Sequence, residues 1–159
     1  MPIKGFPSPK HINDMNANKF LYQVIQKTLD FPTYTVPQCT HLRNVAEAHA
    51  RALTIDPVPG VKTRLILNAG YMEWAFVIEF LKKHRPAIAS RLPDISLASK
   101  LPCFQYRVDT SLSAKLLKLE YIPVEDILLE VIDDLLVWEQ DKTPAQLDDT
   151  QQPDMPSEA

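Results

Sequence analysis

The sequence predicts an α/β domain, and three features support that fold class. Segments with apolar residues at helical spacing alternate with short apolar segments that suit strands. Leu65-Ile66-Leu67 is a continuous apolar run, as expected for a strand of a parallel sheet covered on both faces. A helical segment from Asn44 to Leu53 has a face of small residues suited to close packing on such a sheet. The 159 residues provide for one ordinary domain.

The first predicted helix follows an irregular lead-in. Residues 1–14 are rich in proline, lysine and polar groups. From Asn16 onward the apolar residues fall on one helical face, and either Asn16 or Asn18 is suited to cap this helix. The apolar positions are Phe20, Leu21, Val24, Ile25 and Leu29.

A second helix is predicted directly after a short strand at residues 39–42. Asn44 is followed three residues later by Glu47, which is a capping-box pattern with Asn in the place of the usual Ser or Thr. This spacing predicts Asn44 as the N-cap. The segment Pro57-Val58-Pro59-Gly60 predicts the end of the unit.

The middle of the chain contains a helix between two breakers. Gly70 interrupts the chain after the apolar strand, and an amphipathic helix follows as far as Pro86. Three prolines predict that residues 86–102 form a loop across the surface. Residues 104–108 then alternate apolar and polar side chains, which is typical of a half-buried strand.

Two helices are predicted in the remainder. A short helix spans residues 112–119, with Asp109 or Thr110 near its cap. Pro123 suits the first turn of the last helix. The buried stripe predicted for that helix consists of Ile127, Leu128, Val131, Leu135 and Trp138.

The composition changes abruptly after residue 138. Residues 139–159 contain six acidic residues, one lysine and no apolar periodicity. We therefore expect a disordered acidic tail over 139–159, a lead-in over 1–14 and a folded part over 15–138.

Charge and hydropathy exclude several classes of partner. The net charge of −3 gives no reason to expect nucleic acid or an anionic membrane as partner. No apolar run approaches the roughly 20 residues that a membrane helix needs, and the first residues lack the apolar core of a signal peptide. A cytoplasmic protein is therefore expected.

The cysteines and histidines predict no metal site. Cys39 and Cys103 lie far apart, and small apolar packing is the favoured role for both, although a disulfide would form if the fold brought them together. His41 and His49 have no cysteine or carboxylate at ligand spacing. A hydrogen-bonded histidine at the end of a strand is the favoured interpretation of His41.

Glycine is too scattered to bind a dinucleotide. A dinucleotide-binding turn needs two or three glycines within about six residues, so that the backbone can approach the pyrophosphate. Here Gly5, Gly60 and Gly70 stand alone. We therefore predict that this chain alone binds no NAD(P) cofactor.

Several segments together resemble one enzyme family. They are residues 41–53, 64–71, 109–111 and 119–123, with weaker similarity at residues 16–22 and 69–74. In this order the set resembles the C-terminal half of extended short-chain dehydrogenases/reductases of the NAD-dependent epimerase/dehydratase superfamily, nearest to the dihydroflavonol reductase and aldehyde/ketone reductase branch. Two departures are Lys118, where glycine is common, and Leu112, where lysine is frequent.

The resemblance refines the expected fold and function. It implies the C-terminal part of a doubly wound parallel sheet with a small, mostly helical substrate domain, lacking the N-terminal Rossmann half. It also implies NADP as the family's cofactor and a substrate-lining role for Asn18, His41 and Tyr71. The chain would then be the substrate-binding half of an NADP-dependent carbonyl reductase of secondary metabolism.

The family's catalytic pair is missing. Its Tyr-x-x-x-Lys motif places an ammonium one helical turn from the tyrosine hydroxyl. All five tyrosines lack the lysine; the pairs are Tyr22 with Gln26, Tyr34 with Gln38, Tyr71 with Ala75, Tyr106 with Thr110 and Tyr121 with Glu125. No catalytic residue is therefore predicted, and a complementary reductase half or a homo-oligomer is expected. The alternative is a non-catalytic binding or assembly subunit that pairs with another chain.

Overall fold

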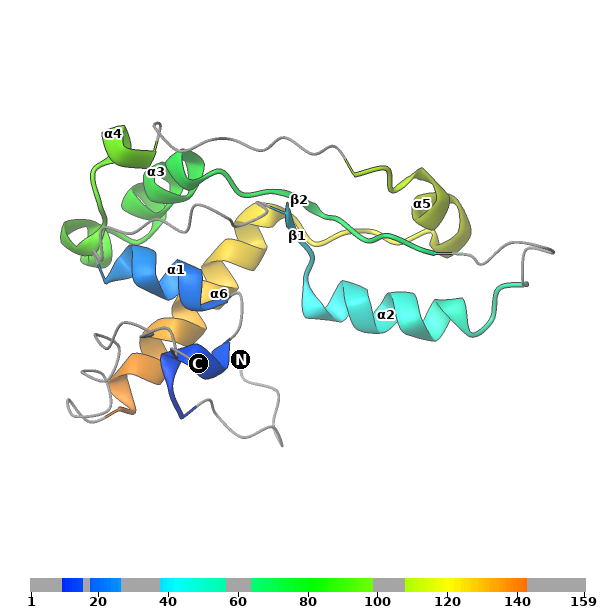
Figure 1. Ribbon diagram of the computed structural model, residues 1–159, viewed down its shortest axis with the longest axis horizontal. Helices are drawn as coiled ribbons and strands as arrows, with labels where there is room; N and C mark the ends of the chain where they lie inside the picture. Colours follow the sequence, from blue (N-terminus) through cyan, green and yellow to red (C-terminus); the bar gives the residue numbers. More distant parts are fainter. Residues whose placement is uncertain (1–9, 16–17, 27–37, 57–63, 99–107, 143–159) are drawn as a thin grey trace, which may run out of the picture.

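The computed structural model describes residues 10–15, 18–26, 38–56, 64–98 and 108–142. They form a helical body and an arm that projects from it (Figure 1). The body consists of η1 (Ile12–Met15), α1 (Asn18–Ile25), α3 (Trp74–His84), η2 (Pro86–Arg91), α4 (Ile95–Ala98) and α6 (Val124–Gln140). The arm consists of α2 (Leu42–Ala52), α5 (Ser111–Leu117) and the extended segments 64–69 and 118–123. Strands β1 (Gln38–Cys39) and β2 (Gly70–Tyr71) lie where the two parts meet.

The body is built around the apolar face of α6. This helix packs on α1 and α3, and their facing side chains form one core. The buried residues of these three helices are Leu21, Tyr22, Val24, Ile25, Val77, Ile78, Leu81, Ile127, Leu128, Ile132, Leu135 and Trp138. The three helices predicted from apolar spacing are therefore confirmed, and most of the described residues that set the period are buried, although Phe20 and Val131 are only partly so.

The surface loop predicted at residues 86–102 is wrong for residues 86–98, the part of it that the structure describes. The segment begins with η2, whose first residue Pro86 has a backbone conformation suited to a first helical turn, and α4 follows. Ile88 and Leu92 are buried in the body core. Pro86 begins η2, and Pro93 lies between η2 and α4. The sequence pattern had indicated an irregular connection in this segment.

The predicted doubly wound parallel sheet is also wrong. Among the described residues, the sheet consists of β1 and β2 alone, paired antiparallel with Gln38 opposite Tyr71. Residues 64–69 are extended but belong to no strand, and Ile66 is 50% exposed. A parallel strand needs neighbouring strands and cover on both faces, and the described chain supplies neither beside this segment.

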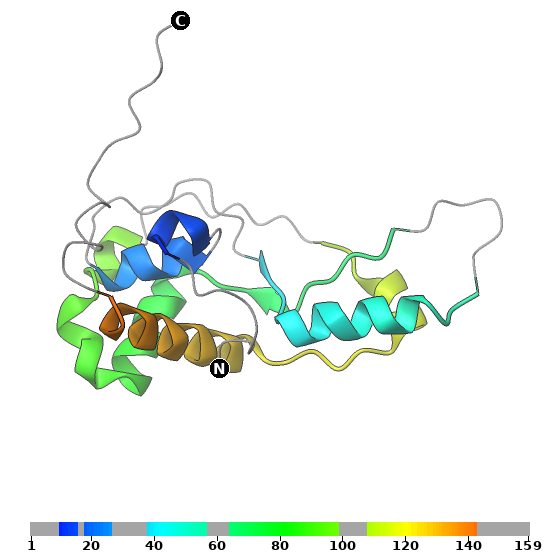
Figure 2. The same cartoon turned by 90° about the horizontal axis from the view of Figure 1, so that it is seen from below.

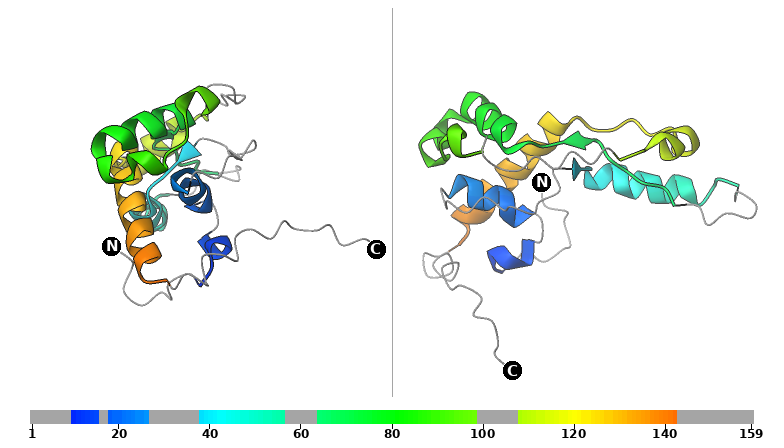
Figure 3. Two further views of the ribbon diagram at one scale, coloured as in Figure 1. Left: turned by 90° about the vertical axis from the view of Figure 1, so that its left-hand side faces the viewer. Right: turned by 45° about the horizontal axis from the view of Figure 1, so that its top comes forward.

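In the part of the chain that the structure describes, the arm consists of a single pair of helices and two connecting segments. Helix α2 packs on α5, and the two extended segments run along them (Figure 2; Figure 3). Its buried residues are Ala48, Leu117 and three polar ones, namely His41, Asn44 and Ser113. Exposed large apolar side chains are frequent on it: Leu42, Leu53, Ile66 and Leu112.

Gly70 lets β2 pass close to the start of α6. A Cβ atom at this position would meet Cγ2 of Val124 at 2.6 Å, closer than real Cβ atoms approach. Val124 is β-branched and the first residue of its helix, so it has little freedom to move aside. Gly70 therefore fixes the approach of the arm to the body.

Some sequence predictions fall outside the described residues. These are the lead-in over residues 1–9, the cap candidate Asn16, Leu29 of the first helix, the turn at residues 57–60, residues 99–102 of the loop, the strand residues 104–107, Cys103, and the tail from residue 143. Helix α6 itself continues through Gln140, beyond the change in composition at residue 139. In the described part of the chain, no helix combines the length and apolar character needed to cross a membrane.

Candidate functional site at the junction of arm and body

His41 caps α2 with one ring nitrogen and connects the arm to the body with the other. It is the N-cap of α2, and its Nδ1 accepts a hydrogen bond from the backbone N–H of Arg43 at 3.0 Å. Its Nε2 lies 3.0 Å from Oε2 of Glu130 on α6. A backbone N–H only donates, so Nδ1 carries no proton and Nε2–H donates to the carboxylate. The ring is 8% exposed, so this histidine is a buried, fully hydrogen-bonded residue.

Arg43 adds a second, weaker link to the same carboxylate. Its guanidinium lies 3.4 Å from Oε1 of Glu130, and its side chain is 72% exposed. Exposed ion pairs of this kind contribute at most about 1 kcal/mol. The histidine bond is therefore the main side-chain connection between α2 and α6.

Asn44 is not the N-cap that its capping-box pattern predicted. Helix α2 starts two residues earlier, at Leu42, and Asn44 lies within its first turn. Its amide donates to the carbonyl of Glu120 at 2.8 Å and accepts from the N–H of Ile122 at 3.0 Å. The side chain is 2% exposed and pairs with the segment 118–123 much as a neighbouring strand would. Because the site requires both a donor and an acceptor, an aspartate would leave one of these bonds unmade.

The arm is braced by further side-chain bonds to backbone carbonyls. Arg51 donates from Nη1 to the carbonyls of Leu117 and Lys118 at 2.6 and 2.7 Å, and Nη2 pairs with Glu47. These carbonyls end α5 and have no partner within the helix. Ser113 donates to the carbonyl of Ile66, tying α5 to the extended segment. Hydrogen bonds from polar side chains thus hold the elements of the arm together, whereas apolar burial holds those of the body together.

Tyr71 offers an accessible aromatic face beside the junction. It is 38% exposed, and its hydroxyl accepts a hydrogen bond from the N–H of Val108 at 3.1 Å. The ladder pairs Tyr71 with Gln38, three residues before His41, so Tyr71 and His41 lie at opposite ends of one short ladder. Asn18 lies elsewhere: it is the exposed first residue of α1. Of the three residues predicted to line the substrate, Tyr71 is therefore in the ladder, His41 follows β1 by two residues, and Asn18 is on a body helix.

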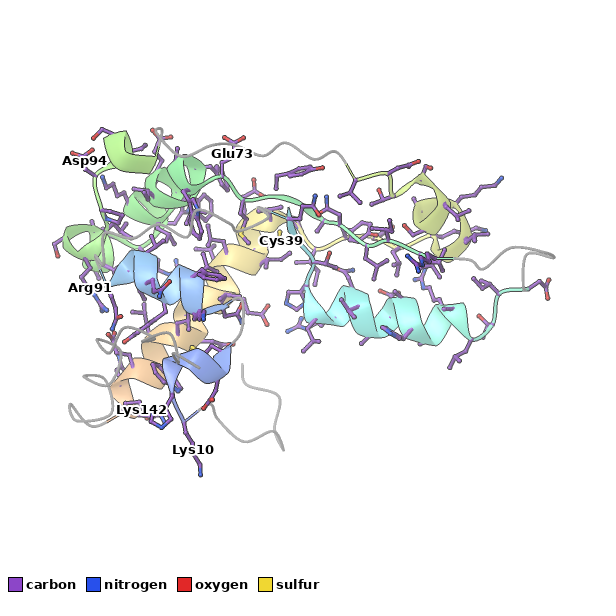
Figure 4. All side chains as sticks on the ribbon, in the orientation of Figure 1. Lys10, Cys39, Glu73, Arg91, Asp94 and Lys142 are labelled. Atoms are coloured by element: carbon purple, nitrogen blue, oxygen red, sulfur yellow. The ribbon has the colours of Figure 1, made fainter. Side chains whose placement is uncertain are left out.

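Cys39 lies where the arm meets the body (Figure 4), and the ladder pairs it with Gly70. It is half-buried, and its thiol is 3.8 Å from the carbonyl oxygen of Gly70. Burial raises the pKa of this thiol, and the charge of Glu125 adds to the effect. A raised pKa keeps the sulfur protonated, so Cys39 is a packing residue here and not a nucleophile.

A polar cluster in the body was not predicted from the sequence. Arg91 makes a bidentate pair with Glu139 at 2.7 and 2.9 Å, and its Nε donates to the carbonyl of Ile25. The Tyr22 hydroxyl donates to the same carboxylate at 3.0 Å, and its ring packs edge-on against Trp138. The cluster fastens the end of α6 to α1 and η2. No local signal could have indicated it, because its partners are 48 and 117 residues apart.

The cluster shifts the pKa values of two of its members. Burial raises the pKa of Tyr22 to about 12, and the hydrogen bond and charge of Glu139 add to this. Burial also raises the pKa of Glu139, but hydrogen bonds from Arg91 and Tyr22 outweigh it and hold that pKa below its ordinary value. Both shifts favour the pair as observed, with a neutral hydroxyl and a charged carboxylate.

Two features of the described residues bear on metal and cofactor binding. They contain no group of three or more His, Cys, Asp or Glu side chains placed to hold a metal ion. The one glycine among them, Gly70, has the space beside it filled by Val124, so its backbone is not open to a pyrophosphate. The chemical role open to the junction is contact with another molecule, because the side chains of Tyr71 and Leu42 are exposed there.

One comparison with known proteins gives a relative. A ketoreductase of Aspergillus niger is 28% identical over 127 residues, which include 76% of this chain. The match spans only 37% of that ketoreductase. No family model matches the chain, and no solved structure matches it. The chain is therefore similar to part of a ketoreductase, which supports a reductase-like character.

Proposed function

We propose that this chain is the substrate-covering part of a reductase related to NADP-dependent carbonyl reductases, and that it does not reduce a carbonyl compound alone. The observation that carries the proposal is the similarity to the ketoreductase, of which this chain spans 37%. The reductase chemistry then depends on polypeptide that supplies the cofactor turn and the Tyr-x-x-x-Lys pair. The branch within the superfamily, the truncation and the role in secondary metabolism belong to this proposal.

The character of the arm supports the need for a complementary part. Leu42, Leu53, Ile66 and Leu112 expose apolar surface along it. Segment 64–69 belongs to no strand among the described residues, although the N–H of Ala69 donates to the carbonyl of Cys39 at 2.8 Å. Such surfaces are normally covered by another part of the chain or by a partner. In the proposed enzyme, the arm faces the nucleotide-binding part and the body covers the substrate.

Tyr71 is the residue that we propose to contact substrate. Its ring is accessible next to the junction, whereas both ring nitrogens of His41 are already engaged. Asn18 is retained as a second contact, because its side chain is exposed at the start of α1. The cofactor in this proposal is NADP, bound by the complementary part.

Two measurements test the reductase proposal. Calorimetric titration of the purified chain with NADPH should give no micromolar binding, because a backbone cradle for the pyrophosphate is missing from the described residues. If coding sequence upstream of Met1 encodes a glycine cluster and a Tyr-x-x-x-Lys motif, the longer protein should oxidise NADPH in the presence of ketones, and Tyr71→Ala should raise KM. Micromolar cofactor binding by the present chain, or an upstream region without either motif, would contradict the proposal.

A non-catalytic binding or assembly subunit is the second candidate. The same exposed apolar residues of the arm favour it, because they suit a protein partner as well as a nucleotide-binding part. Sedimentation of the purified 18.1 kDa chain at tens of micromolar distinguishes a monomer from an oligomer or complex. Both candidates expect self-association or a stable complex; the second gains if the complex forms without any cofactor-binding chain. A monodisperse monomer would count against both.

A further inference from the structure

We infer that His41 is a proton-sensitive cap that couples the arm–body junction to the first turn of α2. The inference rests on the two bonds of its ring, which respond oppositely to protonation. In the observed state Nδ1 accepts from the N–H of Arg43, and Nε2–H donates to Glu130. This geometry requires the neutral ring, because only one of the two nitrogens can accept.

A second proton on the ring changes both bonds. It must be placed on Nδ1, which then points an N–H at the N–H of Arg43, and the cap of α2 is lost. At the same time the bond from Nε2 to Glu130 becomes charge-assisted and stronger. Protonation therefore tightens the link to α6 while it releases the start of α2.

The charged groups at the ring come from two helices. Helix α6 contributes Glu130, whose Oε2 lies 3.0 Å from Nε2. Helix α2 contributes Arg43, whose guanidinium is mostly exposed and opposes protonation only weakly. The segment 118–123 contributes the backbone carbonyl of Glu120, which accepts from Asn44 and not from the ring. The carboxylate of Glu130 is therefore the charged group in hydrogen-bond contact with the imidazole.

The consequence reaches the segment that Asn44 holds. Asn44 lies in the same first turn as Arg43 and bonds to Glu120 and Ile122. Loosening of this turn is therefore transmitted to the connection between α5 and α6. Acidification is expected to weaken the grip of α2 on that connection while α2 stays attached to the body through the imidazolium.

Hydrogen exchange of the full chain, followed by NMR at pH 7.5 and pH 5.5 and corrected for the intrinsic pH dependence, tests this inference. The protection factor of the Arg43 amide should fall by roughly fivefold at the lower pH, the amount expected for loss of one N-cap. His41→Asn keeps an acceptor at the cap but cannot titrate, so it should show the same protection at both values. His49→Asn, the matched change of the other histidine of α2, should leave the response intact.

The ring itself provides a second readout that no folding defect of a variant can obscure. In the wild-type chain, nitrogen resonances of His41 should show Nδ1 unprotonated at pH 7.5, and the loss of Arg43 protection should follow the appearance of a proton on Nδ1 as the pH falls. An Arg43 amide whose protection is independent of pH, a response that survives in His41→Asn, or a proton on Nδ1 at pH 7.5 would each overturn the inference.

Discussion

The body and the arm are stabilised by different kinds of interaction. The body buries a continuous apolar core between α1, α3 and α6, and its largest side chains, such as Tyr22 and Leu128, are fully buried. The arm has few buried residues, and three of those are polar. It is held by bonds from Asn44, Arg51 and Ser113 to backbone groups. Apolar burial makes the body self-sufficient, whereas the arm depends on a few bonds and on cover from elsewhere.

Removal of apolar volume from the body should have the largest effect. Leu128→Ala deletes three carbons from a fully buried position on α6, so the free energy of unfolding should fall by about 2–5 kcal/mol. Val137→Ala is the matched control on the same helix, because its side chain is 55% exposed; we expect a change below about 1 kcal/mol. Urea denaturation measures both. Equal losses would mean that the core is not centred on α6.

A single amide should have nearly as large an effect on the arm. Asn44→Asp loses the bond to the carbonyl of Glu120 and brings a carboxylate against that oxygen, which should destabilise the arm by about 2–4 kcal/mol. Ala46→Asp places the same charge at an exposed position of α2 and should cost about 1 kcal/mol or less. Hydrogen exchange of α2 and α5 reports the difference. If exchange in α6 accelerates equally, the arm is not an independent unit.

The cluster around Glu139 predicts a loss of stability in strong base. The folded pKa of Tyr22 is raised to about 12, above its ordinary value near 10, so its contribution is complete below pH 10 and is lost as the pH rises toward 12. Two pH units correspond to at most about 2.7 kcal/mol. Tyr22→Phe should be less stable than wild type by about 1 kcal/mol at neutral pH. The difference should shrink above pH 10, and a difference that stays constant to pH 12 would contradict the assigned cause.

Lys118 is expected to give the smallest effect, with the opposite sign. It ends α5 in the left-handed conformation, with φ 48° and ψ 42°, which strains any residue except glycine. Lys118→Gly should therefore stabilise the arm by about 0.5–1 kcal/mol. Lys115→Gly, inside the same helix, should destabilise it by about 1 kcal/mol. A loss of stability in both variants would mean that the conformation of Lys118 carries no strain.

The sequence predicted the helices better than the sheet because helices are specified locally. The stripe on α6 and the spacing in α3 are contained in the segments themselves, so both helices were correctly predicted. The run Leu65-Ile66-Leu67 has the composition of a buried strand, but a strand also needs neighbours that its own sequence does not supply. The apolar run therefore predicted a sheet covered on both faces, and the described residues form no such sheet around it.

The junction was predicted only in part. His41 was expected to be a hydrogen-bonded residue, and its bonds to Arg43 and Glu130 confirm that interpretation. Asn44 followed the pattern of a cap but proved to be a link to a segment 76 residues away. Side chains that connect distant segments carry no local signature, because the distance along the chain between partners is set by the fold. The position of Lys118, in contrast, has a local reason to favour glycine, because its φ is positive.

Residue-resolved hydrogen exchange of the intact chain tests the central claim most directly. The claim is that the body is self-sufficient and that the arm is only partly covered. Amides in the middle of α3 and α6 should exchange with the free energy of global unfolding, while those of α2 and α5 should open at a free energy at least about 2 kcal/mol lower. Equal protection in α2, α5 and α6 would show that the arm and the body unfold as one unit, and would contradict the account.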